Sequence, residues 1–127
     1  HQKGVAGVVT DGAYRDSPAI AASGMPAFAR AMNAHTNKTV HYPSEIQVPV
    51  GCGEVAVFPG DIIVGDGEGF VVVPAHLAAQ VGDAASEMED KEDFILEKIR
   101  SGASIVGTYP PDEKTLAEFE AWKKARS

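Results

Sequence analysis

The chain has 127 residues, a formal net charge of -7 and a hydrophobic content of 44%. This length and composition fit one small globular domain with its own core, and they exclude a disordered tail. The negative charge argues against nucleic acid or an anionic membrane surface as the main partner, and no apolar run is long enough for a membrane span. Cys52 is the single cysteine, so an intrachain disulfide is excluded and a reducing, cytoplasmic location is expected.

The first residues lead almost at once into an apolar run. Residues 5–9 are valine-rich and bounded by glycines, which predicts a short, fully buried strand. Asp11 and the glycine after it predict a turn. A serine N-cap followed by Pro18 predicts a short helix that ends at Gly24. A domain that opens on a central strand is unusual, so we expect an N-terminal part of this domain to lie upstream.

The middle of the chain predicts β-structure. Apolar runs bounded by turn residues indicate strands at 26–32, 45–50, 54–58, 62–64 and 70–73. The last two flank a glycine-rich loop and predict a hairpin. Turns are expected at 51–53 and 59–61, and the polar residues 33–44 predict a loop with room for a short strand at 39–41.

The periodicity changes to that of a helix at residue 74. Apolar residues at helical spacing predict a helix over 74–100, continuous or broken once near Gly82, that ends at Gly102. A small edge strand is expected at 105–106, and Asp112 can cap a last amphipathic helix. Strands in the first part and helices in the last predict a layered α/β (α+β) domain.

The adjacent pair Arg15 and Asp16 is the strongest candidate for chemistry. It lies between the first predicted strand and the first predicted helix, where α/β folds often bind ligands. An arginine can bind a carboxylate bidentately and stabilise an enolate, and an aspartate can hold a hard cation such as Mg²⁺. The alternative is an ordinary surface ion pair. One carboxylate also rarely holds Mg²⁺ without water and further carboxylates.

Other patterns favour structural interpretations. Residues 65–69 lack the spacing of a calcium loop or a phosphate loop, which favours a hairpin turn. The histidines lack zinc-binding spacing, and Cys52 between two glycines favours packing over reactivity. The acidic residues 87–93 favour a solvated helix face, although one of them could reach a cation in a neighbouring subunit.

Several stretches together resemble the RraA-like family, which includes the class II 4-hydroxy-4-methyl-2-oxoglutarate/4-carboxy-4-hydroxy-2-oxoadipate aldolases. Their order and spacing along nearly the whole chain make the resemblance specific. The similar stretches are GVAGVVTDG (4–12) with Arg15 and Asp16, GMPAFA (24–29), VFPGD (57–61), DGEG (66–69) and VVVP (71–74).

The resemblance implies one RraA-like domain over residues 1–127, with a swivelling β/β/α fold assembled as homotrimers or homohexamers. It implies that Asp16 holds a divalent metal, Mg²⁺ or Mn²⁺, and that Arg15 binds the carboxylate and enolate of pyruvate. The implied reaction is a lyase reaction that cleaves a 4-hydroxy-2-oxo acid to pyruvate, with oxaloacetate decarboxylation as a related activity. A small 2-oxo acid and further copies of the chain are then the expected partners, without nucleic acid or membrane.

The sequence departs from the family pattern in two places. The Gly-Asp segment that precedes the Arg-Asp pair in the family would fall before His1, so we expect this chain alone not to complete the site. Many aldolases of the family carry an acidic residue where this chain has Ala19. A glutamate from a neighbour's long helix is also expected near the metal, and Glu92 is the candidate. The alternative function is that of an RraA-type regulator, in which an acidic surface binds and inhibits ribonuclease E.

Overall fold

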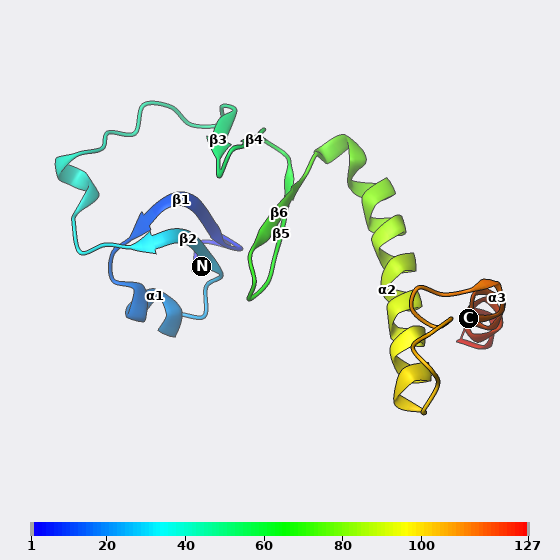
Figure 1. Cartoon of the computed structure of the whole chain (residues 1–127). Helices are drawn as coiled ribbons and strands as arrows, with labels where there is room; N and C mark the ends of the chain where they lie inside the picture. The colour runs from blue at the N-terminus through cyan, green and yellow to red at the C-terminus, as the bar shows by residue number, and fades with distance from the viewer. Residues whose placement is uncertain (1, 127) are drawn as a thin grey trace. The chain divides into compact units, whose positions relative to one another are not determined.

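The structure, a computed structural model, describes residues 2–126. Its contacts divide the chain into two compact units, His1–His76 and Leu77–Ser127. The strands of the described residues all lie in the first unit, and the two long helices lie in the second (Figure 1). The mixed α/β class expected from the sequence is confirmed, whereas the single domain over residues 1–127 stays a prediction.

A parallel pair of strands organises the first unit. β1 (Val8–Tyr14) pairs with β2 (Ala27–Met32), and α1 (Ser17–Ala22) connects them beside the sheet (Figure 1). The second strand and the short helix confirm the sequence predictions for these residues. Because the strands are parallel, their carboxyl ends meet at the same edge of the sheet.

β1 differs from the strand predicted at residues 5–9. It begins only at Val8 and runs through Asp11 to Tyr14 instead of turning at Asp11. Its register with β2 shifts between Thr10 and Ala13. Such a bulge absorbs extra residues within a strand, so an Asp-Gly pair can lie inside it. The expectation of full burial is also wrong, because Val8 is 38% exposed on a sheet that has only two strands among the described residues.

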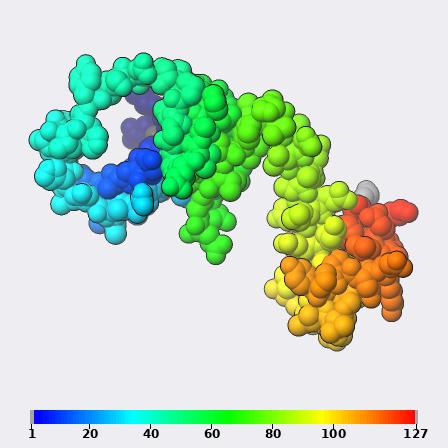
Figure 2. Space-filling view, turned by 45° about the horizontal axis from the view of Figure 1, so that its top comes forward, coloured from blue at the N-terminus to red at the C-terminus, as the bar shows by residue number. Residues whose placement is uncertain are grey.

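The segment between β2 and β3 is less regular than predicted. It contains the short 3₁₀ helix η1 (Asn37–Thr39) instead of a strand at 39–41, and β3 begins only at Val50. The strand predicted at 45–50 is therefore wrong. Gln47 has a φ of 60°, which leaves the extended region, and Pro49 has no N–H for a ladder. In Figure 2 this segment, coloured cyan to green, arches away from the strands.

Two antiparallel hairpins complete the first unit. β3 (Val50–Cys52) pairs with β4 (Val55–Val57), so the turn lies at 53–54 and not at 51–53. Gly53 and Glu54 both have positive φ, 58° and 67°, as a two-residue turn between twisted strands requires.

The second hairpin and the turn before it confirm the sequence predictions. β5 (Ile62–Gly65) pairs with β6 (Phe70–Val73), and the turn at 59–61 is closed by a bond from Asp61 N to Phe58 O of 3.0 Å. Gly65 permits a close approach, because a Cβ there would lie 2.7 Å from Cζ of Phe28.

The second unit is built on one long helix. The 3₁₀ turn η2 (Ala75–Leu77) leads into α2 (Ala78–Arg100). α2 passes Gly82 without a break and ends before Gly102, which confirms the continuous form of the predicted helix. The edge strand predicted at 105–106 is wrong, because Ile105 O accepts hydrogen bonds from the following turn. α3 (Glu113–Arg126) begins as predicted, with Thr115 N donating to Asp112 Oδ1 at 2.8 Å.

Aromatic packing joins α3 to the C-terminal half of α2. Phe119 is 2% exposed, and its ring centroid lies 5.7 Å from that of Phe94. Trp122 packs against both rings, and its Nε1 donates to Glu97 Oε2 at 3.0 Å. These contacts explain why the two helices lie side by side (Figure 1). Among the described residues, no helix combines the length and apolar character needed to cross a membrane.

Candidate functional site

Arg15 and Asp16 lie where β1 ends and α1 begins, as the sequence predicted. Asp16, and not the serine after it, is the N-cap, and its backbone is left-handed with φ 61° and ψ 31°. Its carbonyl oxygen accepts hydrogen bonds from Ala19 N at 3.0 Å and Ile20 N at 3.1 Å. A left-handed residue other than glycine is uncommon, and such conformations cluster at functional sites. This one turns the chain sharply from strand to helix.

The two side chains form an ion pair. Arg15 Nε donates to Asp16 Oδ2 at 3.0 Å, and the side chains are 52% and 66% exposed. Ion pairs this exposed contribute little to stability. Because the pair uses Nε, the two Nη groups of Arg15 keep four N–H donors, enough to bind a second carboxylate bidentately.

A hollow of about 330 Å³ lies over the carboxyl ends of β1 and β2, between residues 14–18 on one side and 32–34 on the other. Two hydrogen bonds tie these sides together. Asn33 N donates to Tyr14 O at 2.8 Å, and Ser17 Oγ donates to Met32 Sδ at 2.9 Å. The Arg15–Asp16 pair therefore belongs to a defined hollow at the end of a parallel strand pair, a usual ligand position in α/β proteins.

Tyr14 and Asn33 also line this hollow, and the sequence analysis did not single them out. The Tyr14 hydroxyl donates to Val8 O at 3.0 Å, and burial raises the pKa of Tyr14, so it is neutral at physiological pH. Asn33 Oδ1 accepts a hydrogen bond from His35 N at 2.9 Å. The signal that could have found Asn33 is its place directly after the strand predicted at 26–32, beside the end of the first strand.

The residues present fit a divalent cation only as a partial site. Asp16 offers hard carboxylate oxygens of the kind that Mg²⁺ prefers, and Mg²⁺ usually keeps several waters when bound by one or two carboxylates. Within residues 2–126, no three histidine, cysteine, aspartate or glutamate side chains gather to hold a metal. Among the described residues that line the hollow, Asp16 is the one carboxylate that could ligate a metal.

Glu92, the third residue predicted for the site, lies on α2 in the second compact unit, with an exposed side chain. Arg15 and Asp16 are brought together within the first unit. The role of Glu92 in the site of a neighbouring subunit stays a prediction.

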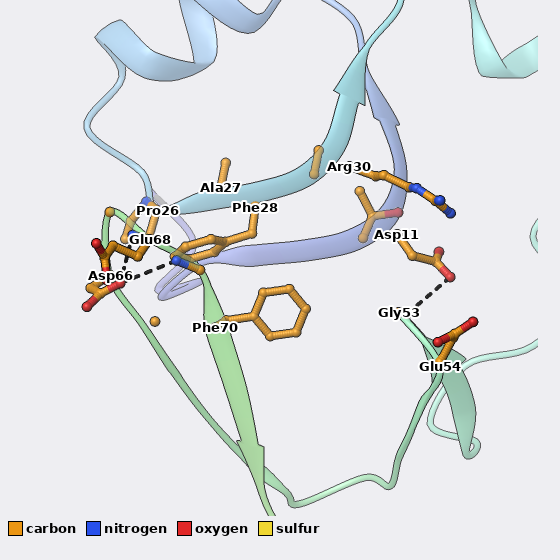
Figure 3. Close-up of a pocket in the computed structure, with 15 residues that line it drawn as sticks. Asp11, Pro26, Ala27, Phe28, Arg30, Gly53, Glu54, Asp66, Glu68 and Phe70 are labelled. Atoms are coloured by element: carbon orange, nitrogen blue, oxygen red, sulfur yellow. Dashed lines mark hydrogen bonds between the residues drawn. The ribbon is translucent and has the colours of Figure 1, made fainter.

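A second hollow of about 1060 Å³ lies elsewhere in the first unit (Figure 3). The rings of Phe28 and Phe70 line it, with centroids 5.8 Å apart. Asp11 Oδ2 accepts a hydrogen bond from Gly53 N at 3.3 Å, and Asp66 Oδ1 accepts one from Glu68 N at 2.8 Å. The sequence suggested that Asp11 is a turn residue, but it lies within β1 and accepts a hydrogen bond from the β3–β4 turn. The Asp66 bond confirms a hairpin loop.

Comparison with known proteins gives the family. The family model described as "RraA-like: Aldolase/RraA" matches residues 1–72, more than half of the chain. A protein of Methanocaldococcus jannaschii, named only as uncharacterized, is 40% identical over 103 residues, 81% of this chain and 49% of that protein. A protein of Halalkalibacterium halodurans, provisionally named a 4-hydroxy-4-methyl-2-oxoglutarate aldolase, is 44% identical over 71 residues, 56% of this chain and 33% of that protein.

Solved structures share the fold. A crystal structure of an uncharacterized protein from Pseudomonas syringae pv. tomato matches with a TM-score of 0.80 and 35% identity, over 84% of this chain and 53% of that one. Streptomyces coelicolor RraAS2, described as an unusual member of the RNase ES inhibitor RraA protein family, matches with a TM-score of 0.69 and 36% identity, over 78% of this chain and 50% of that one. The chain thus spans about half the length of these structures and of the Methanocaldococcus relative. By sequence and by fold, the chain belongs to the RraA-like family.

Proposed function

We propose that the protein is a divalent-metal-dependent lyase of the class II pyruvate aldolase type. It cleaves a 4-hydroxy-2-oxo acid to pyruvate and acts on oxaloacetate as a related decarboxylase. The observation that carries the proposal is the Arg15–Asp16 pair, held by a left-handed turn in a hollow at the end of β1. Support also comes from the relative whose name gives it as an aldolase.

Arg15 is the catalytic and substrate-binding residue of this proposal. Its Nη donors take the carboxylate of the pyruvyl group. In the cleavage, the 4-hydroxyl gives its proton to solvent water and C4 becomes the carbonyl carbon of the fragment that leaves. The C3–C4 bond breaks, and its electron pair enters the enolate of pyruvate. A proton added at C3 then completes pyruvate. The guanidinium lies beside the negative charge as it develops on the 2-oxygen, where fixed charges stabilise a transition state most effectively.

Asp16 is the metal-binding residue of this proposal. It would hold Mg²⁺ or Mn²⁺ through a carboxylate oxygen, while its other role, the bond to Arg15 Nε, keeps the guanidinium in place. When bound, the cation supplies Lewis-acid polarisation of the 2-oxo group. Glu92 of a neighbouring subunit is proposed near the water around that cation.

The experiment that tests the proposal measures pyruvate release from oxaloacetate and from a panel of 4-hydroxy-2-oxo acids. Reactions contain Mg²⁺ or Mn²⁺, or EDTA, and the rate without protein is subtracted. EDTA should abolish the activity, and Asp16→Asn should lower kcat/KM by roughly 10²-fold or more, as the loss of a charge-stabilising group does. Asp83→Asn, a matched change on the exposed surface of α2, should have no effect. Equal activity in Asp16→Asn and wild type would refute the assignment.

A protein regulator is the second candidate function. The net charge of -7 suits a basic partner, and a solved relative belongs to a family described as RNase ES inhibitors. In this case the chain should bind a ribonuclease E-type enzyme and lower its cleavage rate. Binding that persists in Asp16→Asn, together with no pyruvate release by the wild type, would favour the regulator over the lyase.

A further inference from the structure

A third hollow, of about 420 Å³, lies between α1 and β2. It shares Tyr14, Ser17 and Met32 with the hollow that holds Arg15 and Asp16. The hydroxyl of Ser17 donates to Met32 Sδ at 2.9 Å, so this contact lies at the border between the two hollows. A ligand held by Arg15 would therefore have an adjoining space beside it.

The lining of this third hollow is mostly apolar. The apolar side chains come from Ile20 and Ala21 of α1, Met25 of the connection, and Ala27, Ala29 and Ala31 of β2. The three alanines occupy alternate positions of β2, so their methyl groups share one face of the strand. Small side chains on this face leave open a space that larger ones would fill.

The third hollow is also poor in charge. Arg30 is the one charged residue among the described residues that line it. Arg30 belongs to the opposite face of β2, and its side chain extends into the larger hollow that it lines with Asp11 (Figure 3). A carboxylate in the third hollow would lose water without gaining a charged partner, which is unfavourable, whereas an apolar chain gains free energy from burial.

We infer that the third hollow binds an apolar substituent at C4 of the substrate. The site then prefers 4-hydroxy-2-oxo acids with an alkyl chain at C4 over those with a second carboxylate, and the fragment released with pyruvate is an apolar aldehyde. The inference rests on the proposed function, in which Arg15 takes the carboxylate at C1. With that end fixed, the chain beyond C3 can pass Ser17 and Met32 into the adjoining hollow. Ligand pockets usually combine a few polar groups with a mostly apolar lining, as these two hollows do together.

The test measures the Kd of a series of 2-oxo acids that lack a 4-hydroxyl, by calorimetry with Mg²⁺. Pyruvate, 2-oxobutanoate, 2-oxopentanoate and 2-oxohexanoate differ by one methylene each, and 2-oxoglutarate ends in a carboxylate. The proteins are wild type, Ala21→Leu and Ala22→Leu. Ala21→Leu fills part of the third hollow from α1. Ala22→Leu makes the same change one position further along α1, at a residue outside the lining.

In the wild type and in Ala22→Leu, each added methylene should tighten binding by about two- to fourfold, because complete burial of one methylene is worth about fourfold. 2-Oxohexanoate should bind at least about tenfold more tightly than 2-oxoglutarate, since the hollow does not compensate a buried carboxylate. Ala21→Leu should bind pyruvate as the wild type does and should lose the gain along the series.

Three results would overturn the inference and leave the proposed function standing. They are a wild-type series without a gain, tighter binding of 2-oxoglutarate than of 2-oxohexanoate, and a gain that survives unchanged in Ala21→Leu. The wild-type series decides by itself if Ala21→Leu does not bind pyruvate. If the wild type binds none of these acids and releases no pyruvate from any substrate, the proposed function fails and the inference fails with it.

Discussion

Asp16 has an uncommon backbone conformation, and its carboxylate forms a solvent-exposed ion pair. Because this pair contributes little to stability, the side chain can be changed to test function without unfolding the protein. The carboxylate is 66% exposed, and the pair with Arg15 is worth at most about 1 kcal/mol to folding. Asp16→Asn should therefore change the free energy of unfolding by less than about 1 kcal/mol, because asparagine also tolerates a left-handed backbone. A loss of activity in this variant would then report chemistry and not misfolding.

Asp112 gives a pH-dependent prediction at the same scale. The hydrogen bond from Thr115 N lowers the pKa of Asp112 below its ordinary value of 3.8. The folded state thus binds fewer protons, and the stabilisation is present above pH 3.8 and is lost as the pH falls through the lowered pKa. Asp112→Ala should lower Tm at pH 7, and the difference from wild type should shrink below pH 3.8.

Thermal unfolding followed by the fluorescence of the single tryptophan, Trp122, measures this difference. Asp112→Asn is the control, because it keeps an oxygen acceptor for Thr115 N but does not titrate. At pH 7 the Tm of Asp112→Asn should lie closer to that of wild type than to that of Asp112→Ala. A gap between wild type and Asp112→Ala that stays constant down to pH 2 would contradict the capping role.

The sequence predicted the positions and roles of some single residues and not of others. Arg15 and Asp16 could be placed because a strand, a turn and a proline-started helix are local signals. Asp112 could be assigned as a cap for the same reason. Asn33 and Asp11 could not, since their roles depend on the pairing of β1 with β2 and on the approach of the β3–β4 turn.

At the scale of elements, the second unit depends on one aromatic cluster. Phe119 is 2% exposed and touches the rings of Phe94 and Trp122. Phe119→Ala should destabilise this unit by about 3–5 kcal/mol, because a buried ring is replaced by a cavity. Urea unfolding followed by Trp122 fluorescence gives the value. Leu116→Ala on the same helix, at a side chain 40% exposed, should cost clearly less. Equal losses in the two variants would contradict a core centred on Phe119.

Elements with local signals were predicted well, and elements set by long-range pairing were not. The β5–β6 hairpin and α2 follow from turn residues and helical periodicity that lie within each segment. The strand expected at 45–50 does not form, although its apolar residues alternate, because Gln47 has a left-handed backbone that interrupts an extended strand. β1 extends beyond its apolar run because its partner β2 continues to pair with it through a bulge.

At the scale of the whole molecule, composition indicated only a small globular domain, the order of strands and helices predicted the α/β class, and the family resemblance predicted the RraA-like fold. The apolar strands of the first unit remain exposed in a single chain, for example Val64 at 57% and Val71 at 60%. Two-stranded sheets of this kind need cover from other protein to be stable. We therefore propose that protein outside residues 2–126 covers the strands of the first unit. The proposed role of Glu92 requires one such contribution, a further copy of the chain.

Subunit mixing tests whether sites are shared between copies. Asp16→Asn and Glu92→Gln should each lower pyruvate release when present alone. Mixed and reassembled together, they should recover part of the activity, because some sites then combine an intact Asp16 with an intact Glu92 of a neighbour. Asp16→Asn mixed with itself is the control and should recover none. Full activity of Glu92→Gln alone, or no recovery on mixing, would contradict the shared site.

The exchange of the pyruvate methyl hydrogens for deuterium tests the central claim most directly, because it reports enolate formation at Arg15 and Asp16 without any cleavage step. It is followed by proton NMR in D₂O with Mg²⁺. The wild type should exchange the methyl group well above the rate without protein, and either EDTA or Asp16→Asn should return the rate to that background. Exchange that is absent in the wild type, or that persists unchanged in Asp16→Asn, would contradict a metal-assisted pyruvate lyase site at the end of β1.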